Sequence, residues 1–398
     1  MRISPSKSPL RRKGNTPSPV ILPDELVAEV LSFLPVNSLM QLKCVSKSWN
    51  SLISDPFFVK LHLIKSSRNP LLSLFSTQSS NNSISAVLTP MPMRCIREIT
   101  NANHDTKYLL AVEEYYMSVG SCNGLICMLH DSSDVFVYRD LSLRFWNPAT
   151  RSLSDKLDYF CTSVKELNFK FSYGYDNLTN KYKVVAFRPN EVKVFTLGEN
   201  IWRNIQSFPV DPYYCTHNPY NCGVYLSNSI NWFAVRNHEN FVYGRWKDLI
   251  VSVDEFVIIS LDLGMETYTQ LRLPQALNEV PYVMPTVSIL MNCLCFTHYS
   301  KGNHFVIWQM REFGVEDSWI QLFKFRYQHQ RCIGVRHGYC NLLPLHVLEN
   351  DDTLLLVNGE QFIRYNRREN RLVKLPAINE CLYLRYAKHY IESLVSTC

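Results

Sequence analysis

Five copies of one hairpin pattern, spread over most of the chain, constrain its fold more than any other feature. Each copy has an apolar strand, a turn with Asn, Gly or Glu, and an aromatic or large apolar residue that enters a second strand. The copies are LRFWNPATRSL, VKVFTLGENIWRNI, IISLDLGMETYTQLRLP, FVIWQMREFGVEDSWIQLF and FIRYNRRENRLVKL. Aligning their turns brings five residues into register, at intervals of 49, 66, 47 and 57 residues: Asn147, Thr196, Asp262, Gln309 and Asn366.

A second hairpin precedes each copy and brings the repeating unit to four strands. These hairpins are SCNGLICML, YGYDNLTNKYKVVAF, GVYLSNSINWFAV, VSILMNCLCFTHY and LHVLENDDTLLLV. Four strands in about 50 residues is the period of a kelch-like β-propeller. The two longer intervals contain insertions around residues 236–249 and 327–339.

Residues 70–118 span one further period ahead of the first visible unit. We expect them to complete a sixth blade with a strand from residues 382–390. Such a blade would close the ring and remove exposed sheet edges. The pattern therefore predicts an all-β propeller of about six blades, and a repeated β-sandwich is the alternative that it leaves open.

An N-terminal segment with helical periodicity precedes the repeats. Of the 42 residues from Val20 to Leu61, 23 are apolar. Their spacing predicts three short helices, with Asn37 or Ser38 as the N-cap of the second and Ser46 as the N-cap of the third. Asp55-Pro56 is expected to mark the exit. So small a unit is at the limit of what a core of its own can stabilise, so we expect it to bury its spare apolar face against a partner.

Charge and composition narrow the classes of function. The net charge is +6, but residues 1–19, which are basic and rich in Ser and Pro, carry +5 of it. We expect this tail to be disordered. The rest of the chain has too little excess positive charge for a general nucleic-acid surface. No run approaches the roughly 18 apolar residues of a membrane span, and no signal peptide is recognisable. We therefore expect a cytoplasmic or nuclear protein that binds neither nucleic acid nor membranes.

Motifs for metal binding or catalysis are missing from the sequence. The 13 cysteines include no C-x-x-C pair, so we interpret them as reduced and mostly buried thiols without zinc. The pairs His298 with His304 and His329 with His337 are interpreted as ordinary loop histidines. The sequence has no phosphate-binding glycine loop, no G-x-S-x-G and no H-E-x-x-H. We expect no cofactor, no metal and no active site.

The segment ILPDELVAEVLSFLPVNSLMQLKCVSKSWNSLISDPFF resembles an F-box. It carries Leu22-Pro23, Leu34-Pro35-Val36, KCVSK with Trp49, and LISDP, and it departs only slightly, at Met40-Gln41. The remainder resembles the F-box-associated domain of plant F-box/kelch-repeat proteins. The matching pieces are SCNGL at 121–125, WNPATR at 146–151, GYD at 174–176, YKVV at 182–185 and HYIESL at 389–394.

The resemblance implies a substrate-recognition subunit of a Skp–cullin–F-box ubiquitin ligase. The F-box would dock on a Skp-type adaptor, and through it on a cullin and a RING protein. The propeller would bind a target protein for ubiquitination and degradation, and the chain itself would not be an enzyme. One alternative is a protein-interaction scaffold without a role in degradation. A remoter alternative is a propeller lectin or sugar-acting enzyme, which would need converging carboxylates or a metal cluster at the propeller mouth.

The predicted organisation is an α+β multidomain chain: a tail over 1–19, a three-helix F-box over 20–62, a connector and first blade over 63–118, and the propeller over 119–398. Ten residues are expected to bind the adaptor or to shape its contact face, with the internal core as the alternative for each: Leu22, Pro23, Leu26, Val30, Leu31, Leu34, Pro35, Leu39, Leu42 and Val45. Nine residues of types common in binding hot spots are expected to bind the target, with blade packing as the alternative: Tyr213, Tyr214, Tyr220, Phe241, Tyr243, Trp246, Tyr327, Arg331 and Arg336.

Overall fold

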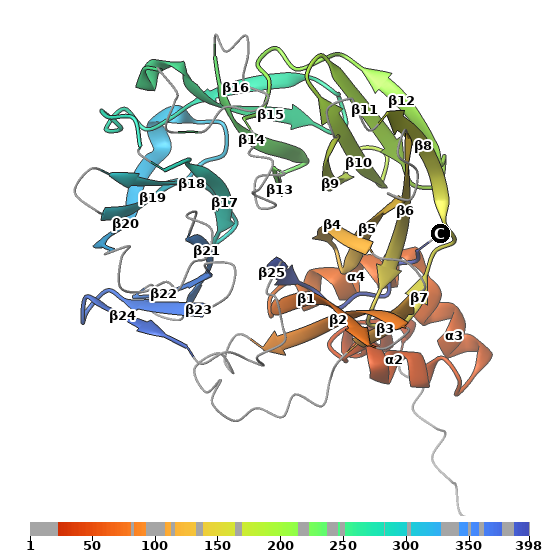
Figure 1. Ribbon diagram of the computed structural model, residues 1–398. Helices are drawn as coiled ribbons and strands as arrows, with labels where there is room; N and C mark the ends of the chain where they lie inside the picture. The colour runs from red at the N-terminus through yellow and green to blue at the C-terminus, as the bar shows by residue number, and fades with distance from the viewer. Residues whose placement is uncertain are drawn as a thin grey trace, which may run out of the picture.

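A computed structural model gives the fold. It describes residues 23–80, 83–92, 108–112, 116–132, 138–163, 169–213, 223–236, 246, 251–281, 283–300, 304–327, 342–348, 352–357, 362–375 and 386–397. Helices occupy the N-terminal part and strands the rest. Figure 1 shows the strands arranged in sheets around a ring, with the helices beside it.

Four helices form the N-terminal unit: α1 (Asp24–Leu31), α2 (Val36–Leu42), α3 (Lys47–Ser54) and α4 (Pro56–Ser66). The prediction of three helices was wrong by one. Asp55-Pro56 begins α4 instead of marking an exit: the Asp55 carboxylate accepts the backbone N–H of Phe57 at 2.8 Å, and Pro56 occupies the first helical turn.

The helices enclose a small core of their own. Its buried members include Leu31, Val36, Leu39, Ile53 and Phe58. The Ser46 hydroxyl accepts the backbone N–H of Trp49 at 3.1 Å, which confirms the predicted cap of α3. The predicted cap of α2 was wrong, because that helix begins at Val36 and no side chain caps it.

Within the described residues the strands form six antiparallel sheets. The first contains β25 (Tyr386–Tyr390), β1 (Leu71–Ser80), β2 (Ser83–Pro92) and β3 (Tyr108–Val112). The second contains β4 (Tyr116–Cys122), β5 (Leu125–Ser132), β6 (Tyr138–Asn147) and β7 (Ser152–Leu153), with β8 (Leu157–Ser163) also paired to β6. The third contains β9 (Lys170–Asp176), β10 (Lys181–Arg188), β11 (Glu191–Thr196) and β12 (Ile201–Ile205).

The remaining sheets follow in chain order. The fourth contains β13 (Val224–Leu226), β14 (Ser229–Val235), β15 (Phe256–Asp262) and β16 (Tyr268–Arg272). The fifth contains β17 (Thr286–Leu290), β18 (Cys293–Ser300), β19 (His304–Met310) and β20 (Trp319–Arg326). The sixth contains β21 (Leu343–Leu348), β22 (Thr353–Val357), β23 (Phe362–Asn366) and β24 (Arg371–Lys374).

This arrangement confirms the predicted propeller architecture. The repeated hairpins are the strand pairs β6–β7, β11–β12, β15–β16, β19–β20 and β23–β24. The prediction of about six four-stranded blades is not met in full. Among the described residues five sheets are four-stranded, and the remaining sheet has a fifth strand, β8. The ring in Figure 1 also sets aside the alternative of a repeated sandwich.

The ring closes through its C-terminal strand. β25 pairs with β1 in antiparallel register from Leu71 with Tyr390 to Phe75 with Tyr386. The first sheet therefore combines the two ends of the propeller, as the sequence predicted for residues 70–118 and 382–390. Residues 382–385 lie outside the described residues.

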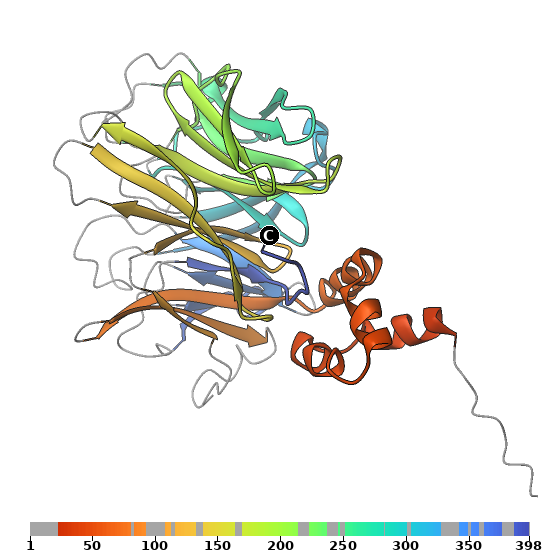
Figure 2. The same ribbon diagram turned by 90° about the vertical axis from the view of Figure 1, so that its right-hand side faces the viewer.

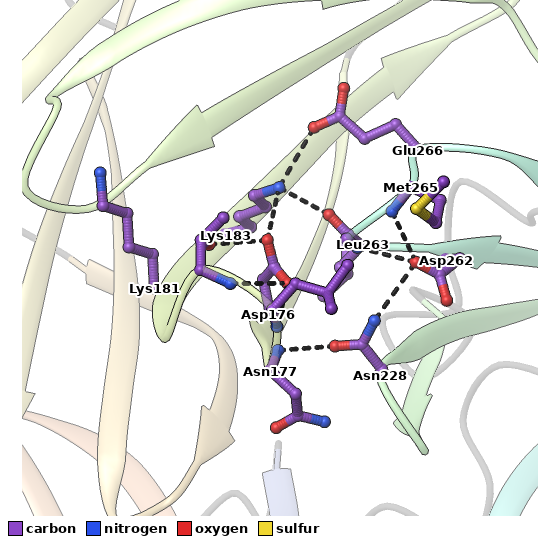
Figure 3. A network of polar contacts seen from close by, with 12 residues as sticks. Asp176, Asn177, Lys181, Lys183, Asn228, Asp262, Leu263, Met265 and Glu266 are labelled. Atoms are coloured by element: carbon purple, nitrogen blue, oxygen red, sulfur yellow. Dashed lines mark hydrogen bonds and ion pairs between the residues drawn. The ribbon is translucent and has the colours of Figure 1, made fainter.

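A buried ionic cluster joins the third sheet to the fourth (Figure 3). The Lys183 ammonium lies 2.9 Å from the Asp176 carboxylate within its own sheet. It also donates to the Leu263 carbonyl at 2.6 Å and lies 3.2 Å from the Glu266 carboxylate, both in the turn between β15 and β16 of the next sheet. Lys183 and Asp176 are almost fully buried. The lysine thus compensates a buried carboxylate and fixes two neighbouring blades together.

Candidate protein-docking surfaces

An exposed apolar stripe runs along the first helix. Leu26 is 54% exposed, Val30 66% and Phe33 62%. Their spacing of four and three residues places them on one face of α1 and of the turn that follows it. Side chains of this type seldom stay in water as a group unless a partner covers them. The stripe is therefore the strongest candidate for a docking surface on the helical unit.

The fourth helix holds the end of the stripe in place. The Lys65 ammonium lies 4.6 Å from the centre of the Phe33 ring and 2.5 Å from the Glu29 carboxylate. Ile64, beside this lysine, is 50% exposed, and Phe57 at the start of α4 is 87% exposed. The sequence reasoning missed Phe33, Phe57 and Ile64. Only Phe33 could have been found from spacing, because it lies three residues after Val30.

The residues predicted to bind the adaptor divide into four groups. Leu31 and Leu39 are buried in the helical core, which favours the alternative of core packing for these two residues. Leu22 lies outside the described residues. Leu34 and Leu42 are half-buried. The other five are exposed, and their contact with an adaptor stays a prediction: Pro23, Leu26, Val30, Pro35 and Val45.

The interior of the helical unit also contains a neutral histidine. His62 in α4 is buried, and its Nε2 atom lies 3.0 Å from the Leu34 carbonyl. Burial lowers the pKa of His62, and this effect outweighs the hydrogen bond to Leu34 and the charge of Glu392, which both raise it. His62 is therefore uncharged at neutral pH and serves as a packing residue that fixes the chain at Leu34.

Strand direction places the helical unit on one face of the ring. In the second to sixth sheets, the turn between the innermost strand and its neighbour lies on the same face of the ring as the turn between the two outer strands. We call this the near face and the opposite one the far face. β25 ends and β1 begins on the near face. Because α4 leads directly into β1, the helices lie there, as Figure 2 shows.

The connections predicted to bind a target leave from the far face. They join β12 to β13, β14 to β15, and β20 to β21. By the alternation of strand direction, the described ends of all three lie opposite the helices. Loops on a rigid scaffold are common places for binding residues. Six of the nine predicted target contacts lie outside the described residues: Tyr214, Tyr220, Phe241, Tyr243, Arg331 and Arg336.

The other three predicted target contacts are buried. Tyr213 is 7% exposed, Trp246 9% and Tyr327 1%. The Trp246 indole donates to the Pro281 carbonyl at 2.7 Å, and its ring packs edge-on against Tyr213. Tyr327 packs beside Tyr299. The burial of these three side chains favours the alternative of blade packing over contact with a target.

Neither a cluster of metal ligands nor a membrane-spanning helix is found among the described residues. Among the described residues, no three His, Cys, Asp or Glu side chains gather where they could hold a metal ion. No described helix has the length and apolarity required to cross a bilayer. Of the described cysteines, Cys122, Cys127 and Cys295 are buried. Burial raises the pKa of Cys122 to about 12, which keeps its thiol protonated and unreactive.

The fold and the site define a class of protein: a propeller that carries, on its near face, a helical module with an exposed apolar stripe. Residues 21–61 match the F-box domain, and residues 60–279 match the F-box associated beta propeller domain. The chain belongs to the F-box proteins with an F-box-associated propeller, which confirms the resemblance found in the sequence.

Relatives span nearly the whole chain. F-box/kelch-repeat protein At3g23880 of Arabidopsis thaliana is 28% identical over 396 residues, covering 95% of this chain and 96% of its own. F-box protein CPR1 of the same plant is 24% identical over 405 residues, covering 95% and 89%. Among solved structures, TolB from Acinetobacter baumannii reaches a TM-score of 0.41 at 10% identity, covering 85% of this chain and 72% of that chain. That structural likeness is too low to carry any argument.

Proposed function

We propose that this protein is the substrate-recognition subunit of a Skp–cullin–F-box ubiquitin ligase in the cytoplasm or nucleus. Its F-box docks on a Skp-type adaptor, and the far face of its propeller binds a target protein for ubiquitination and degradation. The observation that carries the proposal is the exposed stripe of Leu26, Val30 and Phe33 on a unit that matches the F-box. Membership of the F-box family supports the same conclusion.

The energetics favour docking through this stripe. Each of its side chains has more than half of its surface in water. Covering one such side chain with a partner contributes roughly 1 kcal/mol or more. Because the core of the F-box is small, these residues cannot turn inward without displacing Leu31 or Leu39, which already fill it. These three side chains can therefore be removed from water only by contact with a partner.

In this proposal the chain contributes binding and proximity, and the chemistry belongs to other subunits. The adaptor connects the F-box to a cullin and a RING protein, which bring the ubiquitin-loaded enzyme. Holding the target beside that enzyme raises the effective concentration of its lysines. The chain needs no cofactor for this role.

The docking surface is tested by reversing its polarity. Leu26→Asp combined with Val30→Asp should abolish pull-down of a purified Skp-type adaptor by the full chain. Ile201→Asp is the matched control, because Ile201 on β12 of the propeller is 64% exposed, nearly the same as Val30. The control should bind the adaptor like the wild type. Adaptor binding retained by the double variant would contradict the docking surface.

A second experiment separates a ligase subunit from a scaffold. Proximity labelling with the proteasome blocked, in cells with wild-type chain or with residues 21–61 deleted, identifies proteins that accumulate near the chain. A ligase subunit should co-purify with cullin, and its target should live longer when the F-box is removed. A target whose half-life is the same with both chains would favour the scaffold alternative.

A further inference from the structure

The last residues of the chain lie between the F-box and the propeller (Figure 2). We call residues 391–397 the C-terminal strap. Leu394 is 8% exposed and packs in the F-box core with Leu31 and Val36. The next residue, Val395, packs against the apolar core between the second and third sheets. Two neighbouring side chains of the strap thus enter the cores of two different domains.

The propeller holds the backbone of the strap through Asn147. This side chain is fully buried at the end of β6. Its amide nitrogen donates to the carbonyls of Ser393 at 3.0 Å and Val395 at 2.8 Å. Its amide oxygen accepts the backbone N–H of Ala149 at 3.1 Å, and Ala149 itself packs on the F-box core. One asparagine therefore orients both the strap and the turn beneath the F-box.

The propeller also provides a close seat for the strap at Gly124. Its backbone has a φ of +80°, and a Cβ atom there would lie 2.3 Å from the Ile391 carbonyl and 2.5 Å from the Ser393 hydroxyl. Only glycine allows this approach. On the first sheet, the Tyr108 hydroxyl donates to the Glu392 carboxylate at 2.9 Å. The strap is thus fixed from two blades.

Three of the motifs found in the sequence meet at this place. SCNGL contributes Gly124, WNPATR contributes Asn147 and Ala149, and HYIESL contributes residues of the strap itself. SCNGL and WNPATR form two hairpins of the second sheet. Their contacts show that they also hold the strap, which reaches the F-box.

We propose that the C-terminal strap locks the F-box in one orientation on the near face of the propeller. Besides the strap, the F-box is held by the short connection between α4, which ends at Ser66, and β1, and by the packing of Ala149 on its core. The strap adds an attachment from the other end of the chain. The further consequence, that a target on the far face is held at a fixed position relative to the adaptor, rests on the proposed function.

Limited proteolysis of the full chain tests the lock. Arg68 lies in the connection between α4 and β1, and trypsin cleaves after it when the connection opens. Gly124→Ala pushes the strap away, and we expect it to accelerate this cleavage about tenfold, equal to about 1.4 kcal/mol of docking free energy. Gly198→Ala is the matched control: its φ is +93°, so its backbone strain is alike, but nothing lies within 4 Å of the added carbon.

A second pair of variants tests the contact of the strap with the F-box core. Leu394→Ala should also accelerate cleavage after Arg68, whereas Leu375→Ala, a propeller leucine that is likewise 8% exposed, should not. Equal cleavage rates for Gly124→Ala and Gly198→Ala would overturn the proposal, whatever Leu394→Ala does. Because the assay contains no adaptor or other ligase component, its failure is distinct from a failure of the proposed function.

Discussion

Lys183 shows how one residue can connect two blades. Its ammonium group contacts a carboxylate of its own sheet and two groups of the next one, so both sheets depend on the same charge (Figure 3). Burial alone would raise the pKa of Asp176, but hydrogen bonds from Thr179 and Lys183 outweigh it and lower the pKa. Removing the lysine would leave that carboxylate ionised and buried without its cation.

We expect Lys183→Met to lower the free energy of unfolding by about 3 kcal/mol, because breaking a buried ion pair leaves its partner uncompensated. Urea denaturation followed by tryptophan fluorescence measures the change. Lys181→Met is the matched control on the same strand, since Lys181 pairs with Glu199 at the surface. Surface pairs contribute little. A loss as small in Lys183→Met as in the control would contradict the role of the buried cluster.

His298 gives the propeller a dependence on pH. The side chain is buried in β18, and its Nε2 atom accepts a hydrogen bond from the Trp308 indole at 3.2 Å. Burial lowers the pKa of His298 from 6.5 to about 4. Between these values the unfolded chain binds the proton and the folded chain does not, so stability falls as pH falls. We expect the titration of His298 to lower the free energy of unfolding by about 1 kcal/mol as the pH falls from 6.5 to about 5.5.

Two variants separate the contribution of His298 to the pH dependence from that of other histidines. His298→Gln keeps an acceptor for Trp308 but does not titrate, so its urea midpoint should vary less with pH than that of the wild type. Burial lowers the pKa of His346 to about 4 as well, so part of the dependence should remain. His304→Gln, on the neighbouring strand β19, serves as the control. A pH profile for His298→Gln that superimposes on the wild type would contradict the assignment.

At the residue scale, the sequence shows which side chains are apolar or aromatic, but its patterns did not predict which of them are exposed. Leu31 lies next to Val30 in α1, yet one is buried and the other is in the stripe. Both fit an amphipathic helix, and the face of α1 that packs on the other helices, which includes Leu31 but not Val30, decides between them. Tyr213 and Trp246 are buried by each other and by another connection, near Pro281. Such burial depends on contacts distant in sequence, so hot-spot composition could not reveal it.

At the scale of elements, local chemistry made the hairpins predictable. The turn after β15 shows why: the Asp262 carboxylate accepts the backbone N–H groups of Gly264 and Met265, and Glu266 takes a φ of 54°. These contacts lie within a few residues, so they leave a pattern in the sequence. Helix α4 was missed because Asp-Pro occurs both at exits from structure and at helix starts, and the sequence alone did not separate the two.

The start of α4 provides the prediction at this scale. Asp55→Ala removes the acceptor for Phe57, and we expect it to lower the stability of the helix by about 1 kcal/mol. Hydrogen exchange of the α4 amides should become faster, while exchange in the propeller strands should not change. Asp55→Ser keeps a capping oxygen and is the control. Exchange in α4 as slow in Asp55→Ala as in Asp55→Ser would contradict the cap.

At the scale of the whole molecule, the repeat period predicted the ring and its closure, but not the contact of its end with the F-box. Closure follows from counting strands, since an incomplete blade at one end requires a strand from the other. The strap contact has no comparable regularity. Asn147 and Ser393 are separated by 246 positions, and each motif was already explained as part of a hairpin or a chain end.

Two C-terminal deletions distinguish closure from attachment. Deleting residues 391–398 removes the strap but keeps β25, so we expect a monomeric propeller with its β-sheet circular dichroism intact. Deleting residues 386–398 also removes β25, which pairs with five residues of β1. The exposed edge of β1 should then cause aggregation, visible by size-exclusion chromatography. If the longer deletion stayed monomeric and as stable as the shorter one, closure by β25 would not be what holds the ring together.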